Sequence, residues 1–203
     1  MAAVAFSALS TSVLADSLFT VPVAGTLQPR RLTTVLSGDS GSSGGSDSSS
    51  SLFATADYNY TRYLSLGITA RLTDGLSARP EGSVQFAPVG KPYAFAAGFA
   101  NVGVRSFRSQ PYVVGSAYLG KWGGYLGATH DSYGEHAMLG VNYWLTQQVS
   151  LQGDWIGDDG NFLTLGARWQ ARRDIAISAG FSRANAHDSG NGVFASLEKD
   201  FKF

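Results

Sequence analysis

Cysteine is absent from the 203 residues of the sequence, which excludes a disulfide framework, a thiolate metal site and a cysteine nucleophile. Charged residues make up only 15% of the chain, against about a quarter in soluble proteins, so a surface wetted on all sides is not expected. Lys plus Arg balance Asp plus Glu at 15 each, so no basic face indicates nucleic acid. An apolar run of about 18 residues is also missing, which excludes membrane-spanning helices.

The N-terminal region has the features of an export signal. Residues 2–15 form a short apolar run, and Val13 and Ala15 occupy the small-residue positions of a cleavage site before Asp16. We expect residues 1–15 to be a signal peptide and residues 16–29 to be a periplasmic lead. A buried N-terminal helix is the alternative, because no Lys or Arg follows Met1.

A low-complexity tract follows at residues 37–51, which are almost all Ser, Gly and Asp. This composition cannot bury apolar surface, so it predicts a flexible loop.

From residue 52 the main pattern is alternation of apolar and polar residues, which is typical of strands with two unlike faces. Turns rich in Gly, Asn and Asp separate the alternating segments, so consecutive strands are expected to pair as hairpins. The predicted strands lie near 30–37, 52–60, 64–72, 82–89, 93–104, 111–119, 124–131, 136–145, 149–156, 162–170, 175–184 and 191–203. We predict an all-β fold, an antiparallel up-and-down transmembrane barrel of about twelve strands (10–12) over residues 30–203, since closure removes both unpaired edges.

Alternation does not decide which face lies inside, because soluble barrels bury the apolar face whereas membrane barrels turn it toward lipid. Strands of about 8–11 residues match a tilted membrane span, and the polar faces are poor in Lys and Glu. Aromatic residues also gather near the predicted strand ends, as in an interfacial girdle. They are Tyr58, Tyr60, Tyr63, Tyr93, Tyr112, Trp122, Tyr143, Trp169 and Phe201.

The chain ends on an aromatic residue, with an apolar position at almost every second residue before it. The residues of this face are Phe203, Phe201, Leu197, Ala195 and Val193, and Lys199 interrupts them. The ending resembles the terminal strand of bacterial outer-membrane β-barrels. The hairpins at 93–104 and 111–131 are similar, to a lesser extent, to small outer-membrane barrels of exopolysaccharide secretion. The resemblance implies a bacterial outer-membrane location, with the lipid bilayer and the barrel-assembly machinery as partners and both termini in the periplasm.

If the apolar faces meet lipid, a set of charged residues on the polar faces projects into the lumen: Asp57, Arg71, Asp154, Arg168 and Glu198. Buried charge needs water or a partner. These residues therefore either pair and brace the interior, or line a narrow path for a small hydrophilic solute or an exopolysaccharide. Loops or the 16–29 lead could block such a path.

Residues able to bind metal occur together only in one predicted hairpin, as His130, Asp131, Glu135 and His136. Polar residues of a wet loop explain them equally, and we predict no metal site, no cofactor and no catalytic residues. The expected function is a small channel or a structural barrel that is not an enzyme. Two alternatives stay open: a secreted or periplasmic soluble barrel that binds an apolar ligand, and an outer-membrane enzyme with an outward-facing site.

Overall fold

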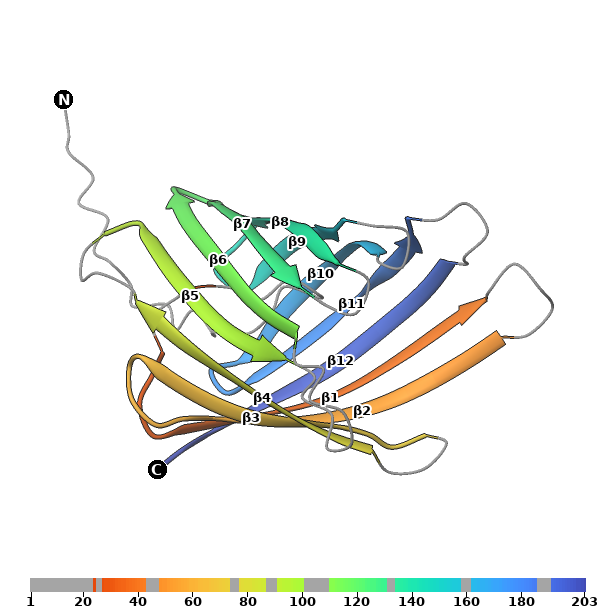
Figure 1. Ribbon diagram of the computed structural model, residues 1–203, viewed down its shortest axis with the longest axis horizontal. Coiled ribbons are helices and arrows are strands. Elements are labelled where there is room, and N and C mark those ends of the chain that lie inside the picture. Colours follow the sequence, from red (N-terminus) through yellow and green to blue (C-terminus); the bar gives the residue numbers. More distant parts are fainter. Residues whose placement is uncertain are drawn as a thin grey trace.

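The computed structural model describes residues 24, 27–42, 48–73, 77–86, 91–100, 110–130, 134–157, 162–185 and 191–203. Within them, twelve antiparallel strands form one closed barrel in which each strand pairs with its sequence neighbours and β1 pairs with β12 (Figure 1). The strands are β1 (Arg31–Ser42), β2 (Ser48–Asn59), β3 (Leu64–Arg71), β4 (Ser77–Phe86), β5 (Tyr93–Ala100), β6 (Gln110–Leu119), β7 (Trp122–His130), β8 (Glu135–Trp144), β9 (Val149–Ile156), β10 (Phe162–Arg172), β11 (Ile175–Ala184) and β12 (Asn191–Lys202). The predicted up-and-down barrel is confirmed.

The barrel has two unlike rims. The terminal rim carries Phe203, the start of β1 and the short turns 60–63, 120–121, 145–148 and 173–174. The loop rim lies at the opposite ends of the strands.

Among the described residues, a helix with the length and apolar character of a membrane span is not found.

Two strands continue into the Ser/Gly tract that the sequence analysis assigned to a loop. β1 and β2 stay in register as far as Ser42 and Ser48, so only residues 43–47 separate them, and these lie outside the described residues. The ladder is made by backbone N–H and C=O groups, which a Ser/Gly composition supplies as well as any other. The prediction from apolar alternation therefore made this hairpin too short.

The fourth strand also differs from the prediction, because it runs over Ser77–Phe86 instead of 82–89. Pro80 and the charged residues beside it indicate a turn in the sequence. The structure nevertheless pairs Pro80 with Ile68 in the β3–β4 ladder. Residues 87–89 and 101–104 of the predicted strands, and the predicted signal peptide, lie outside the described residues.

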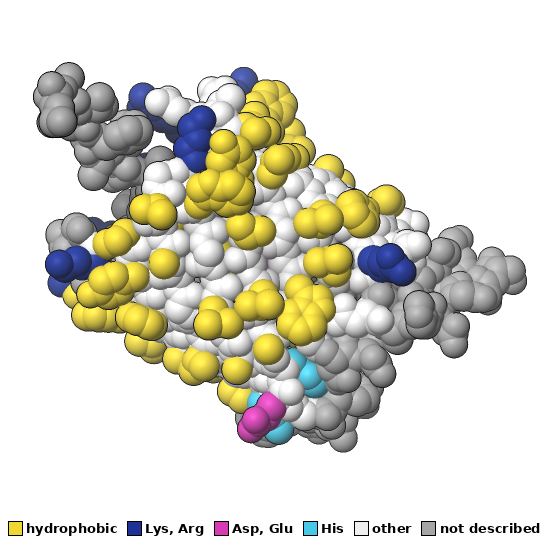
Figure 2. Space-filling view, turned by 90° about the horizontal axis from the view of Figure 1, so that it is seen from above, with side chains coloured by type: hydrophobic (Ala, Val, Ile, Leu, Met, Phe, Trp, Pro, Cys, Tyr) yellow, Lys and Arg dark blue, Asp and Glu magenta, His cyan; other side chains and the backbone are white. Residues whose placement is uncertain are grey.

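The apolar faces of the strands point outward. On β10 the side chain of Leu165 is 41% exposed, whereas the adjacent Thr164 is 2% exposed. The same alternation holds around the barrel, and Figure 2 shows apolar side chains spread across one side of the outer surface. An apolar surface of this extent is unfavourable in water by about 25 cal/mol per Å². The alternative of a soluble barrel with the apolar face inside is therefore wrong.

Aromatic side chains on the outer surface gather at the terminal rim. They belong to the turn after β2 and to the rim ends of other strands, namely Tyr58, Tyr60, Tyr63, Tyr93, Trp122, Tyr143, Trp169 and Phe201. Trp122 and Tyr143 pack with ring centroids 4.4 Å apart and ring planes tilted by 43° across β7 and β8. Tyr112 is the exception, because its side chain points into the barrel over Gly98 and not toward the outer surface.

Candidate functional site: the barrel lumen

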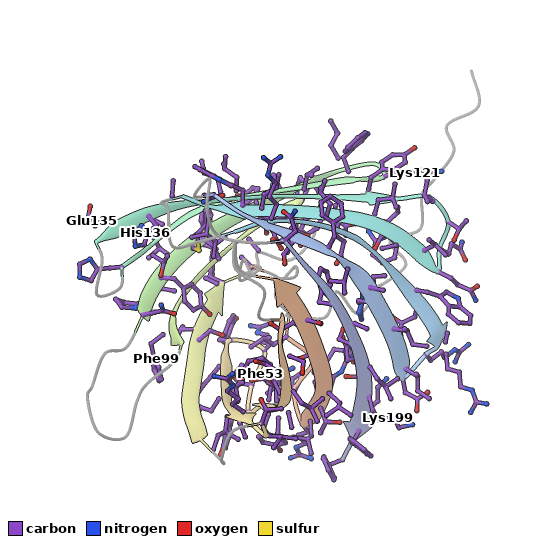
Figure 3. All side chains as sticks on the ribbon, turned by 90° about the vertical axis from the view of Figure 1, so that its right-hand side faces the viewer. Phe53, Phe99, Lys121, Glu135, His136 and Lys199 are labelled. Carbon is purple, nitrogen blue, oxygen red and sulfur yellow. The ribbon has the colours of Figure 1, made fainter. Side chains whose placement is uncertain are left out.

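The lumen has two walls of different chemistry. Charged and hydroxyl side chains line the ionic wall, which comprises β9–β12 and β1–β3, whereas the apolar wall comprises β5–β7. Figure 3 shows side chains directed both into and away from the barrel: Phe53 of β2 lies inside it and Lys199 of β12 lies outside. The division follows from strand parity, since alternate residues of every strand face the interior.

A buried ion pair crosses the seam where β1 meets β12. Arg31 Nε donates to Asp200 Oδ1 at 2.6 Å, and Thr33 Oγ1 donates to the same oxygen at 2.8 Å. The side chains of Arg31 and Asp200 are 4% and 2% exposed. The sequence analysis missed this pair, although Asp200 continues the polar face of Glu198. No local signal connects residues 169 positions apart.

Arg168 and Glu198 form a second ion pair in the lumen. Arg168 Nη1 and Nη2 donate to the two carboxylate oxygens of Glu198 at 3.1 and 3.0 Å. The residues lie on β10 and β12, and the pair passes over Ser178 of the intervening β11. A bidentate pair of this kind holds both charges in a fixed geometry. Two predicted lumen charges thus neutralise each other across a strand.

The other predicted lumen charges also face the interior. Thr164 Oγ1 of β10 donates to the Asp154 carboxylate of β9. Arg71 Nη2 donates to Ser51 Oγ at 2.9 Å. Asp57 covers Gly67, where a Cβ atom would lie 1.8 Å from Asp57 Oδ1. The functional roles of these residues stay predictions.

The apolar wall is built from buried small residues and tyrosines. Ala94, Ala96, Val114 and Tyr125 form a buried cluster, against which Tyr112 and Tyr118 pack. The rings of Tyr118 and Tyr125 meet edge to face at 6.0 Å. This wall carries few groups that could hold a charged solute.

One residue from before β1 lies on the apolar wall. Ala24 is fully buried within the same cluster. Its carbonyl oxygen accepts hydrogen bonds from Ser116 Oγ at 2.7 Å and from Tyr118 Oη at 3.3 Å. Leu27, also from before β1, is 1% exposed. The sequence analysis placed both residues in a lead that could block the lumen, but no residue pattern indicated where in the barrel they would bind.

The weak metal candidates lie at the loop rim. His136 is buried and Glu135 is exposed at the start of β8 (Figure 3). Glu135 pairs with the exposed His130 at the end of β7. Asp131 lies outside the described residues. In the part of the chain that the structure describes, no group of three or more His, Cys, Asp or Glu residues is placed to hold a metal ion.

The terminal strand turns its apolar face outward. Val193, Ala195, Leu197, Phe201 and Phe203 are all exposed on the outer surface or at the rim. Lys199 shares this face and forms an ion pair with Asp174 of the β10–β11 turn. The hydrogen bond from Lys199 lowers the pKa of the Asp174 carboxyl. Lys199 therefore interrupts the apolar pattern because it forms an ion pair at the terminal rim.

The sequence matches no family model and no curated protein, but the fold is similar to solved structures. The NanC porin superposes with a TM-score of 0.64 at 11% identity, covering 82% of this chain and 98% of that one. The KdgM porin gives 0.62 at 8% identity, covering 82% and 99%. An outer-membrane channel from Pseudomonas putida F1 gives 0.53 at 13% identity, covering 86% and 97%. The chain has the fold of bacterial outer-membrane porins and channels.

Proposed function

We propose that the protein is an integral outer-membrane barrel that acts as a small, non-catalytic channel. The observation that carries this proposal is the orientation of the faces: apolar side chains cover the outside, whereas ion pairs and hydroxyl groups line much of the inside. Lipid suits the first surface and water suits the second. The fold shared with porins supports the same function.

The lumen chemistry favours a small hydrophilic solute of low charge. One of the similar structures is described as the KdgM porin in complex with disordered oligogalacturonate, which is an acidic sugar chain. In this protein Arg31 and Arg168 are each bonded to a carboxylate, which offsets their attraction for a second anion. An exopolysaccharide is the other candidate solute. Its support is the resemblance of the hairpins at 93–104 and 111–131 to small outer-membrane barrels of exopolysaccharide secretion.

We place the terminal rim in the periplasm and the loop rim outside the cell. The support is the twelve-strand topology, in which β1 and β12 begin and end at the same rim, together with short turns on one side, as in outer-membrane barrels. The barrel-assembly machinery is the expected partner for insertion, with the outward face of β12 as its signal.

A cysteine-accessibility experiment tests the channel. Cysteine introduced by Gly166→Cys should react with a small hydrophilic thiol reagent added to intact cells, because Gly166 is a half-exposed residue of the inner face. Leu165→Cys, its neighbour on the outer face, is the matched control and should not react. Ser178 is a poorer reporter because it is buried beneath the Arg168–Glu198 pair. The native chain contains no cysteine, so the background is clean.

Planar-bilayer recordings of the purified protein provide the second measurement. Discrete conductance steps together with Gly166→Cys labelling would support the channel. An unreactive Gly166→Cys variant and no conductance under any condition would overturn it and leave a closed structural barrel.

A further inference from the structure

The segment before β1 joins two distant walls of the barrel. At one end Arg30 N donates to Asn59 O of β2 at 2.8 Å, and Arg30 O accepts from Phe203 N at 3.1 Å. At the other end Ala24 O accepts from Ser116 and Tyr118 of β6. Around the barrel, β6 lies four strands from β2 and six strands from β12. Ala24 and Arg30 are six residues apart, so they lie within about 20 Å of each other, although they are anchored to different walls of the barrel.

The chain changes direction at the residue before β1. Arg30 has a φ angle of 57°, a left-handed conformation that residues other than glycine adopt infrequently. Both its N–H and its C=O are bonded, to β2 and to the C-terminal residue, and the surrounding barrel therefore holds this conformation. Such a turn changes the chain direction between residue 29 and β1.

The inner end of the segment occupies a site that fits it. The Ala24 side chain packs on Ala94, Ala96 and Val114, so the apolar wall is covered at this point and not left open to a wet lumen. The Ala24 carbonyl group is buried and requires hydrogen-bond donors, which Ser116 and Tyr118 supply. Both donors lie in the last four residues of β6, near the terminal rim.

We propose that Ala24 and residues 27–30 belong to a crossbar that binds its own lumen wall and obstructs the channel on the terminal side. The ligand of the Ser116–Tyr118 site is thus the chain's own N-terminal segment, held through one peptide carbonyl group and one small side chain. The crossbar narrows the passage, so it determines the size of the solute that passes. The inference that the crossbar obstructs the passage of solute rests on the proposed channel function. The inference that the segment crosses the lumen does not.

Cross-linking tests the crossing without any measurement of transport. In the double variant Ala24→Cys/Ser116→Cys, oxidation or a short bis-maleimide should link the two residues and change migration on a non-reducing gel of the unfolded protein. Ala24→Cys/Ser196→Cys is the matched control, because Ser196 is a half-exposed inner-face residue of β12, away from the apolar wall. Absence of the first link, or equal linking of both pairs, would overturn the crossbar.

Conductance of the same cross-linked protein tests the obstruction. The locked form should conduct less than the reduced form, and Ser116→Ala/Tyr118→Phe, which lacks both donors, should conduct more than the Ser196→Ala control. Equal conductance of locked and reduced protein would refute the obstruction. If no form conducts, the channel proposal fails, while the cross-linking result still decides whether the segment crosses the lumen.

Discussion

Arg168 illustrates how single residues determine the character of the lumen. Its two hydrogen bonds to Glu198 leave neither charge unpaired in a largely buried setting. Removing one partner of such a pair leaves an uncompensated charge, at a cost of about 3–5 kcal/mol.

We therefore expect Arg168→Glu, which sets two carboxylates against each other, to lower the free energy of unfolding by at least this order. The charge swap Arg168→Glu/Glu198→Arg restores opposite charges and should recover most of the loss. Urea unfolding in detergent micelles measures both. If the channel conducts, its ion preference should also change more in the single variant than in the swap. Equal stability of the single variant and the swap would show that the pair does not brace the barrel.

A second residue-scale prediction concerns depth in the membrane. Leu165 lies on the outer face in the middle of β10, whereas Leu119 lies at the terminal rim and is 82% exposed. Leu165→Arg should destabilise the barrel in lipid bilayers by about 2–4 kcal/mol, and Leu119→Arg by about 0–1 kcal/mol, because the cost of a cation falls toward the interface. Chemical unfolding from liposomes provides the comparison, and similar costs at both positions would contradict the proposed membrane span.

At the scale of elements, neighbouring strands approach closely where glycine faces a large side chain. A Cβ atom at Gly180 of β11 would lie 2.3 Å from Leu165 O and 2.7 Å from the Phe194 ring, whereas nothing lies within 4 Å at Gly124 of β7. Gly180→Ala should therefore cost about 1–3 kcal/mol through overpacking, and Gly124→Ala should cost little. Thermal unfolding in detergent compares the two, and an unaffected Gly180→Ala variant would contradict this packing.

The terminal strand gives the second prediction at this scale. Phe203 is 74% exposed, and its backbone N–H donates to Arg30 O. Phe203→Asp keeps that bond, so the purified protein should refold in detergent with nearly unchanged stability. In cells, however, the folded barrel should be lost from the membrane while export continues, if the assembly machinery recognises the aromatic side chain of Phe203. Tyr63→Asp, at an exposed rim aromatic in a turn, is the control. Normal levels of folded Phe203→Asp protein in cells would refute the assembly signal.

At the scale of the whole molecule, closure of the seam makes the barrel a single cooperative unit without exposed strand edges. We expect the native protein to require detergent for extraction and to migrate differently on gels before and after heating. The physical reason is that the outer surface is apolar whereas the described strands bond to one another around a closed sheet. A monomer that stays soluble in water without detergent would contradict this arrangement.

The sequence predicted the two faces of each strand well because apolar and polar residues alternate within the strand itself. Leu163, Leu165 and Trp169 alternate with Thr164 and Arg168 whatever the partner strands are, and the structure keeps that division of faces. Where the signal was not apolar alternation, prediction failed. The Ser/Gly residues of β1 and β2 pair through backbone groups alone, and Tyr112 faces inward although it lies near a strand end.

The amino-acid sequence by itself determined the antiparallel strand order, the two unlike faces and five of the charges on the polar one, since these depend on residues close together in the chain. Tertiary structure alone decided that Arg31 meets Asp200 across the seam, that Arg168 meets Glu198 over β11, and that Ala24 reaches β6. Those contacts join residues 30 to 169 positions apart. They exist only because closure and register bring distant strands around a common interior, and no local pattern records that geometry.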